Sequence, residues 1–227
     1  MKQVFTNDVI QVHPTADGII FSHRFSEEEG KLTVAFKKAV FKTGEFSRIQ
    51  KSYYLIAKFS QHYKDIEQKI GNYITCLCSE LDDGGLLVID ADGTARRFDE
   101  DGNEVKKELL SYHGEAPSSM AVSGRSFWCS YKNDNSIVRY NLATMREELK
   151  LGGSHSTFSK PEGLWIEGRE MFVCNSGSNK LWKVGLSTYA VTEYAEFSEP
   201  VHYFMRSGNN DFVILESGLY LLELVDL

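Results

Sequence analysis

The groups best able to bind a polar ligand lie just after the prolines of this chain. Ser118 and Glu162 each follow a proline directly, and Ser119 and His202 each lie two residues after one. A carboxylate, an imidazole and two hydroxyls that converge on one site would bind a cation or a polar ligand. The alternative is that these side chains are solvated and have no partner. Their value as a site depends on a fold that brings them together.

Patterns typical of other chemistries are missing from the sequence. It contains no G-x-S-x-G nucleophile elbow, no Walker loop and no Rossmann glycine pattern. Its six histidines are scattered, without a pair at metal-ligand spacing. Cys76 and Cys78 form a C-x-C pair, but no second Cys or His pair lies nearby, so buried free thiols are favoured over a metal site. We predict no catalytic residue.

An internal repeat supplies the frame for these residues. Residues 159–186 align without a gap onto residues 115–142, with a proline, a glycine and an asparagine coinciding and apolar positions matching in kind. Each copy reads as three short strands joined by tight turns. A repeat of this length is typical of radial or stacked β architectures.

Groups of four short strands recur from residue 73 onward at roughly 40–45 residues, the spacing of propeller blades. We therefore predict an all-β fold, a β-propeller of five four-stranded blades closed by the N-terminal strand, in a single domain over residues 1–227. Six blades, or an open solenoid or sandwich, are the alternatives. Residues 60–70 have helical spacing, which predicts a short helical insertion or an irregular edge strand. The predicted blades are about 9–72, 73–115, 116–158, 159–198, and 199–227 plus the N-terminal strand.

This fold would bring the residues after the prolines together. In a propeller the innermost strand of each blade lines the central channel, and ligands bind where these strands begin. We therefore expect Ser118, Ser119, Glu162 and His202 at one channel mouth, with positions 8 and 72–73 as their equivalents in the first two blades.

The sequence FVCNSGSNKLWKV at residues 172–184 resembles the repeat of YVTN-type and NHL-type propellers. Those repeats pair a strand ending in Asn with a Gly/Ser/Asn turn and a strand of alternating apolar residues. Residues 127–142 match the same pattern less closely. The resemblance implies a propeller fold and no particular activity, because propellers carry many unrelated functions.

The strand entry KPEGL at residues 160–164 also resembles the gluconolactonase and senescence-marker family of calcium- or zinc-dependent lactonases. That family places a Glu, an Asn and an Asp around one divalent cation, so the resemblance implies Glu162 as a metal ligand at the Asp position. This chain has Ser118 where the Asn is expected, and it has no matching first-blade Glu motif. A single carboxylate would hold a hard divalent cation poorly.

Charge and composition narrow the classes of partner. A net charge of −7 disfavours nucleic acid, which needs a cationic surface. The N-terminus has no signal-peptide pattern, and no apolar run is long enough to span a membrane. These features and the cysteines in apolar runs predict a cytoplasmic protein with no membrane partner.

These observations predict a non-catalytic propeller, a binding or scaffolding module for a protein or small polar ligand at the channel mouth, without a cofactor. The alternative is a lactonase-like hydrolase that depends on a divalent metal, with calcium or zinc at Glu162. A structural part in a larger assembly is a third possibility.

Overall fold

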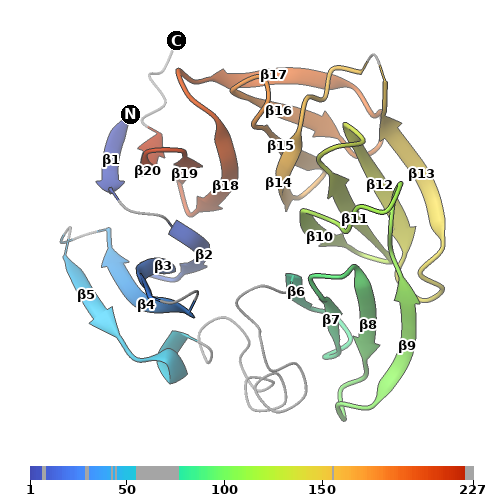
Figure 1. Ribbon diagram of the computed structural model, residues 1–227, viewed down its shortest axis with the longest axis horizontal. Coiled ribbons are helices and arrows are strands. Elements are labelled where there is room, and N and C mark those ends of the chain that lie inside the picture. Colours follow the sequence, from blue (N-terminus) through green and yellow to red (C-terminus); the bar gives the residue numbers. More distant parts are fainter. Residues whose placement is uncertain are drawn as a thin grey trace.

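A computed structural model describes residues 1–6, 9–28, 31–41, 43, 45–54, 77–154 and 156–222. In it the chain forms five four-stranded antiparallel sheets, arranged around one axis as a five-bladed β-propeller (Figure 1). The predicted all-β propeller is confirmed, with five blades and not six. The predicted helical insertion at 60–70 lies outside the described residues.

Four blades are built from consecutive strands, and each strand pairs with the next along the chain. Blade 1 contains β2 (Val9–Thr15), β3 (Gly18–Glu28), β4 (Lys31–Val40) and β5 (Phe46–Ile49). Blade 2 contains β6 (Leu77–Glu80), β7 (Leu86–Ile89), β8 (Thr94–Phe98) and β9 (Glu104–Leu109). Blade 3 contains β10 (Ser119–Ser123), β11 (Ser126–Tyr131), β12 (Ser136–Asn141) and β13 (Glu147–Gly152). Blade 4 contains β14 (Pro161–Glu167), β15 (Glu170–Asn175), β16 (Lys180–Gly185) and β17 (Val191–Glu196).

Blade 5 joins the two ends of the chain. Its first three strands are β18 (Val201–Ser207), β19 (Asn210–Leu215) and β20 (Gly218–Leu222), and its outer strand is β1 (Lys2–Phe5). β1 runs antiparallel to β20, so the N-terminal strand forms the outer edge of this blade (Figure 1). The predicted closure by the N-terminal strand is confirmed. It lets the last blade complete its sheet without a fourth strand of its own.

The repeat conserves turn chemistry between blades 3 and 4. Asn135 and Asn179 lie in the turns β11–β12 and β15–β16, where both adopt a positive φ, 51° and 57°. Asparagine tolerates this left-handed conformation better than most residues, since its short side chain can bond to nearby backbone. The same residue type therefore closes the same hairpin in both blades.

The core consists of apolar layers between neighbouring blades. Trp128 and Ile137 of blade 3 pack with Leu164 and Val173 of blade 4, and all four are at most 2% exposed. Burial of each such side chain contributes about 1.5–3 kcal/mol relative to exposure. Each blade thus depends on its neighbours, and the ring fixes the position of every innermost strand.

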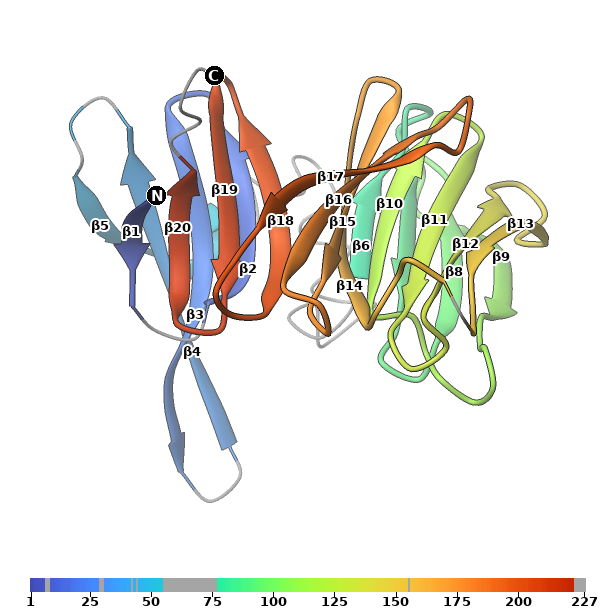
Figure 2. The same cartoon turned by 90° about the horizontal axis from the view of Figure 1, so that it is seen from above.

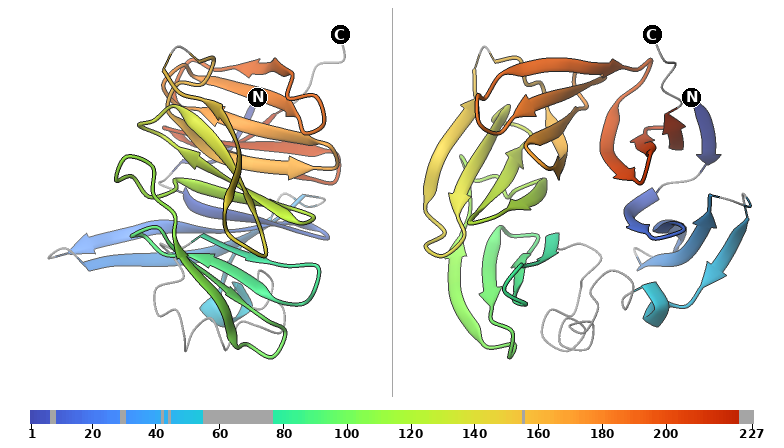
Figure 3. Two further views of the ribbon diagram at one scale, coloured as in Figure 1. Left: turned by 90° about the vertical axis from the view of Figure 1, so that its right-hand side faces the viewer. Right: turned by 180° about the vertical axis from the view of Figure 1, so that it is seen from behind.

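The hairpin β3–β4 departs from the regular blades. Its pairing with β2 ends at His23 and its pairing with β5 ends at Phe36, while β3 and β4 continue to pair with each other. This extension, the arm, projects beyond the ring (Figures 2 and 3). A bulge at Phe25 leaves that ring 64% exposed. The arm projects from the face at which the innermost strands begin, because β3 runs antiparallel to β2.

Candidate binding site at the channel mouth

The innermost strands β2, β6, β10, β14 and β18 surround a central cavity of about 730 Å³. Ser118, Ser119, Glu162 and His202 all line this cavity. The structure therefore brings together the four predicted residues, at the end where β10, β14 and β18 begin. Positions 8 and 72–73, their expected equivalents in blades 1 and 2, lie outside the described residues.

Glu162 lines this mouth as the second residue of β14, with a side chain only 16% exposed. His202 Nδ1 lies 2.6 Å from Glu162 Oε2. The Ser176 hydroxyl donates to Oε1 at 3.0 Å, and Lys132 Nζ donates to the same oxygen. Three donors from blades 3, 4 and 5 therefore converge on one carboxylate.

His202 connects Glu162 to a second carboxylate. Its Nε2 lies 2.8 Å from Glu216 Oε2, while its Nδ1 bonds to Glu162. A neutral imidazole has one N–H, so it can donate to only one carboxylate, whereas the imidazolium donates to both. Carboxylate oxygens at hydrogen-bond distance from both ring nitrogens therefore favour the imidazolium form of His202. We call Lys132, Glu162, Ser176, His202 and Glu216 the Glu162 cluster.

The electrostatics of the cluster favour its charged form. Burial by itself would raise the pKa of Glu162, but the hydrogen bonds from His202 and Lys132 outweigh it and lower the pKa to about 2. The hydrogen bond to Glu162 raises the pKa of His202 above its usual 6.5, although burial opposes this, and Glu216 adds to the effect. Each group of the pair therefore favours the charged form of the other.

Sequence reasoning missed three members of the cluster. Lys132, Ser176 and Glu216 each come directly after the second strand of their blade, at the start of the turn to the third. The signal was present, because the alignment of residues 115–142 with 159–186 places Lys132 on Ser176. Blades 4 and 5 thus each supply one residue at the strand entry and one at this turn, and blade 3 supplies Lys132 at this turn.

The two predicted serines differ in role. Ser119 is 6% exposed, and its hydroxyl accepts the backbone N–H of Leu164 at 3.1 Å, which joins β10 to β14. Ser118 is exposed at the rim, and its backbone N–H donates to the Ser130 carbonyl. In the described part of the chain the Ser118 hydroxyl has no hydrogen-bond partner. Ser118 is thus available to a ligand, while Ser119 supports the fold.

The residues at the mouth do not fit a divalent cation. A metal ion at Glu162 would have to displace Lys132, Ser176 or His202, and the adjacent ammonium would repel it. Among the described residues, no group of three His, Cys, Asp or Glu side chains is placed to hold a metal.

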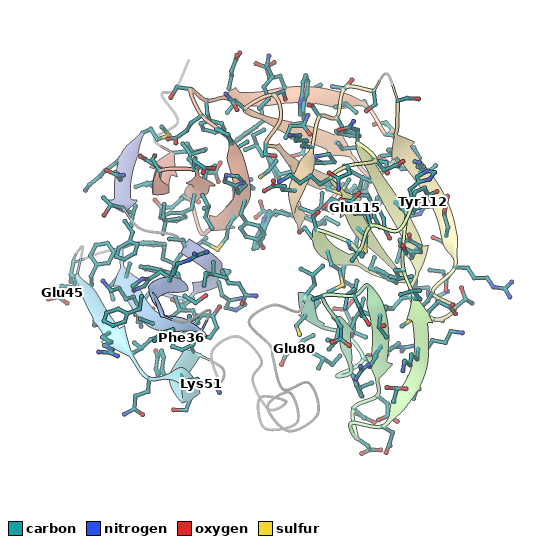
Figure 4. The ribbon with its side chains drawn as sticks, viewed as in Figure 1. Phe36, Glu45, Lys51, Glu80, Tyr112 and Glu115 are labelled. Atoms are coloured by element: carbon teal, nitrogen blue, oxygen red, sulfur yellow. The ribbon has the colours of Figure 1, made fainter. Side chains whose placement is uncertain are left out.

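Away from the mouth, the wall of the cavity becomes more apolar. Met120, Trp165 and Tyr203 contribute apolar surface to its wall, and Glu80 lies beside the central opening at the inner edge of blade 2 (Figure 4). A polar entrance that leads to apolar walls is the usual composition of a small-ligand or peptide site. Such a cavity accepts a polar head group with an apolar body behind it.

Comparisons with known proteins support the fold. No family model and no curated protein matches the chain. Among solved structures, the computationally designed Ika8 protein is 11% identical over 95% of this chain and 58% of its own, with a TM-score of 0.51. The designed Ika4 protein is 13% identical over 64% of this chain and 88% of its own, with a TM-score of 0.50.

The WD40 repeats of RRP9 are 11% identical to this chain over 65% of it and 51% of their own length, with a TM-score of 0.52. This chain therefore matches only about half of the length of RRP9 and of Ika8. These similarities place the chain among propellers, a fold that commonly serves as a binding module.

In the described residues no helix is long and apolar enough to cross a membrane.

Proposed function

We propose that this protein is a non-catalytic binding module whose channel mouth recognises a protein segment or a small polar ligand. The observation that carries the proposal is the Glu162 cluster, a set of charged side chains from three blades at the entrance of a cavity of about 730 Å³. Partly buried charges cost free energy unless they are paired, and here the charges of three blades pair with one another at the entrance.

The hydrogen bonding at the mouth favours binding over catalysis. Both Glu162 oxygens and both His202 nitrogens are already bonded within the protein. A general base needs a free lone pair within reach of the proton that it removes. The Glu162 oxygens and the His202 nitrogens instead face one another and their neighbours in the protein, which supports a binding role over that of a general base.

Three further elements belong to the proposal. The arm supports a protein partner, because it projects from the face that holds the mouth and exposes Phe25, an aromatic suited to an interface. The hairpins of blades 3 and 4 support repeats of the YVTN or NHL kind. Free thiols at Cys78, Cys129 and Cys174 fit the reducing cytoplasm.

A peptide-display selection tests the proposal. Wild-type protein is used to select binders from a library of random linear peptides, and each peptide is then tested against Ser118→Trp. Ser118 is exposed at the rim, so an indole there would cover the entrance without disturbing the core. Ser187→Trp is the matched control, because Ser187 is an exposed serine in the β16–β17 turn, at the opposite face of the ring.

The proposal predicts peptides that bind wild type and Ser187→Trp equally and lose at least about tenfold in affinity for Ser118→Trp, which equals about 1.4 kcal/mol. If every selected peptide binds Ser118→Trp as well as wild type, the mouth is not the binding site.

A further inference from the structure

We propose that Lys132 is the recognition residue of the channel mouth and that the ligand presents a carboxylate to it. This inference rests on the binding function proposed above and adds the chemical class of the ligand. The inference depends on which side chain of the Glu162 cluster can leave its hydrogen-bond partner for a ligand.

Glu162 can release Lys132 without becoming unsatisfied. Its Oε1 accepts from Lys132 and from the Ser176 hydroxyl, and its Oε2 bonds to His202. When Lys132 moves to a ligand, Oε2 keeps its bond to His202. Oε1 keeps the Ser176 hydroxyl, which also lies 3.1 Å from the Lys160 carbonyl oxygen. His202, which Glu162 shares with the exposed Glu216, still pairs with Glu162. The rearrangement therefore avoids the cost of a buried carboxylate without a partner.

Lys132 has the freedom that such an exchange requires. Its side chain is 38% exposed, against 16% for Glu162, and it extends from the turn after β11. An ammonium carries three N–H donors, and within the described residues Glu162 is the acceptor found for Lys132. Its long flexible stem can follow a ligand group by more than an ångström, unlike the imidazole of His202, which is bonded at both nitrogens.

The other charges do not offer a comparable site for a cation. Glu216 is 68% exposed but does not line the cavity, and it is bonded to His202. Glu80 lines the cavity but lies at the end of β6, away from the mouth. Among the residues that the structure describes, Lys132 is thus the lining charge at the mouth that a ligand can reach and use. The exposed Ser118 hydroxyl, which lines the same cavity, is a further donor that a ligand can reach.

Charge reversal at Lys132 tests the inference in the peptide selection described above. Peptides selected on wild type should be enriched in Asp, Glu or a free C-terminal carboxylate, and Lys132→Met should weaken them at least about tenfold. Lys132→Glu should abolish their binding and select peptides with Lys or Arg instead. Lys132→Arg should retain them. Lys107→Glu on the outer strand β9, also an exposed lysine, is the control.

Synthetic versions of one selected peptide identify the carboxylate. Acid-to-amide substitution at each Asp or Glu, and amidation of the C-terminus, should reveal one group whose loss weakens wild type tenfold and leaves Lys132→Met unchanged. A double-mutant cycle then gives a coupling between that group and Lys132. Thermal unfolding of each variant shows that the fold persists.

The outcomes separate this inference from the proposed function. If Ser118→Trp blocks the selected peptides but these lack acidic enrichment and bind Lys132→Met as well as wild type, the mouth binds ligands and the carboxylate assignment is wrong. If Ser118→Trp blocks none of them, the binding function itself fails, and the carboxylate assignment fails with it.

Discussion

At the scale of single residues, Glu162 is the group on which the mouth depends. We predict that Glu162→Gln lowers the free energy of unfolding by about 2–3 kcal/mol, because it leaves Lys132 and His202 without their shared anion. Urea denaturation measures the change. Glu193→Gln is the control: it breaks an exposed ion pair with Lys180 and should cost under about 1 kcal/mol. Equal costs for the two variants would contradict the account.

The same pair predicts a pH window for this stabilisation. Glu162 has a pKa of about 2 in the fold and 4.5 ordinarily, so its contribution is present above pH 4.5 and is lost as the pH falls toward 2. The pKa of His202 is raised above 6.5, so its contribution is complete below pH 6.5 and is lost as the pH rises through the raised value. The stability difference between wild type and Glu162→Gln should therefore be largest between pH 4.5 and 6.5.

Urea unfolding of both proteins from pH 3 to pH 9 measures this difference directly. A difference that stays constant over the whole range would show that the charges of Glu162 and His202 do not stabilise the fold. Comparison with Glu193→Gln removes effects common to any loss of a carboxylate.

The residues of the site were predictable in part. The repeat prolines identified Glu162, His202, Ser118 and Ser119, because a strand entry recurs at a fixed place in every blade. Lys132 was not identified, since its contact with Glu162 joins two blades and depends on how a turn of blade 3 leans toward blade 4. A repeat fixes equivalent positions, but contacts between unlike residues of neighbouring repeats require the coordinates.

At the scale of elements, the close approach of β14 and β18 positions the cluster. A Cβ on Gly163 would lie 2.5 Å from the His202 carbonyl oxygen and 2.8 Å from Tyr203 Cα, both backbone atoms. We predict that Gly163→Ala costs about 1–3 kcal/mol, because the two strands must separate. Gly185→Ala is the control, since there the new Cβ would meet only the movable Thr188 hydroxyl.

Separation of β14 and β18 should also move Glu162 and His202 apart at the mouth. Urea denaturation of both variants, and the pH profile of Gly163→Ala, provide the readouts. A Gly163→Ala protein as stable as Gly185→Ala would mean that the strands lie further apart than this account requires.

The strands and turns of blades 2 to 5 followed from sequence, because alternating apolar residues and Asn or Gly turns determine them locally. The length of the arm did not follow. Residues 18–25 and 31–41 read as two strands, but nothing local shows where β2 and β5 stop pairing with them. The point at which this pairing ends depends on where β2 and β5 themselves begin and end.

At the scale of the whole molecule, closure of the ring by β1 should determine stability. Phe5 contacts Phe21 of blade 1 at a ring-centroid distance of 5.0 Å and belongs to the cluster between blades 5 and 1. We predict that Phe5→Ala lowers the free energy of unfolding by about 2–4 kcal/mol. The loss should be somewhat smaller than for a fully buried phenylalanine, because Phe5 is only partly buried. Phe46→Ala, at a 47% exposed phenylalanine, should cost much less. Thermal unfolding of both variants compares them, and similar losses would contradict closure by β1.

The whole-molecule arrangement was the most predictable level. The last repeat has only three strands of its own, and the N-terminal strand belongs to no other blade. Pairing the two completes the ring. The ligand was the least predictable, because one propeller fold carries many functions and specificity comes from a few side chains at the mouth.

The most direct test of the binding function is a backbone amide NMR titration of the isotope-labelled protein with one peptide selected on the wild type. The account predicts that the largest shift changes occur at Ser118, Lys132, Glu162 and His202, and that Ser118→Trp removes them. Shift changes confined to the opposite face of the ring, near Gly124 and Gly168, would contradict it.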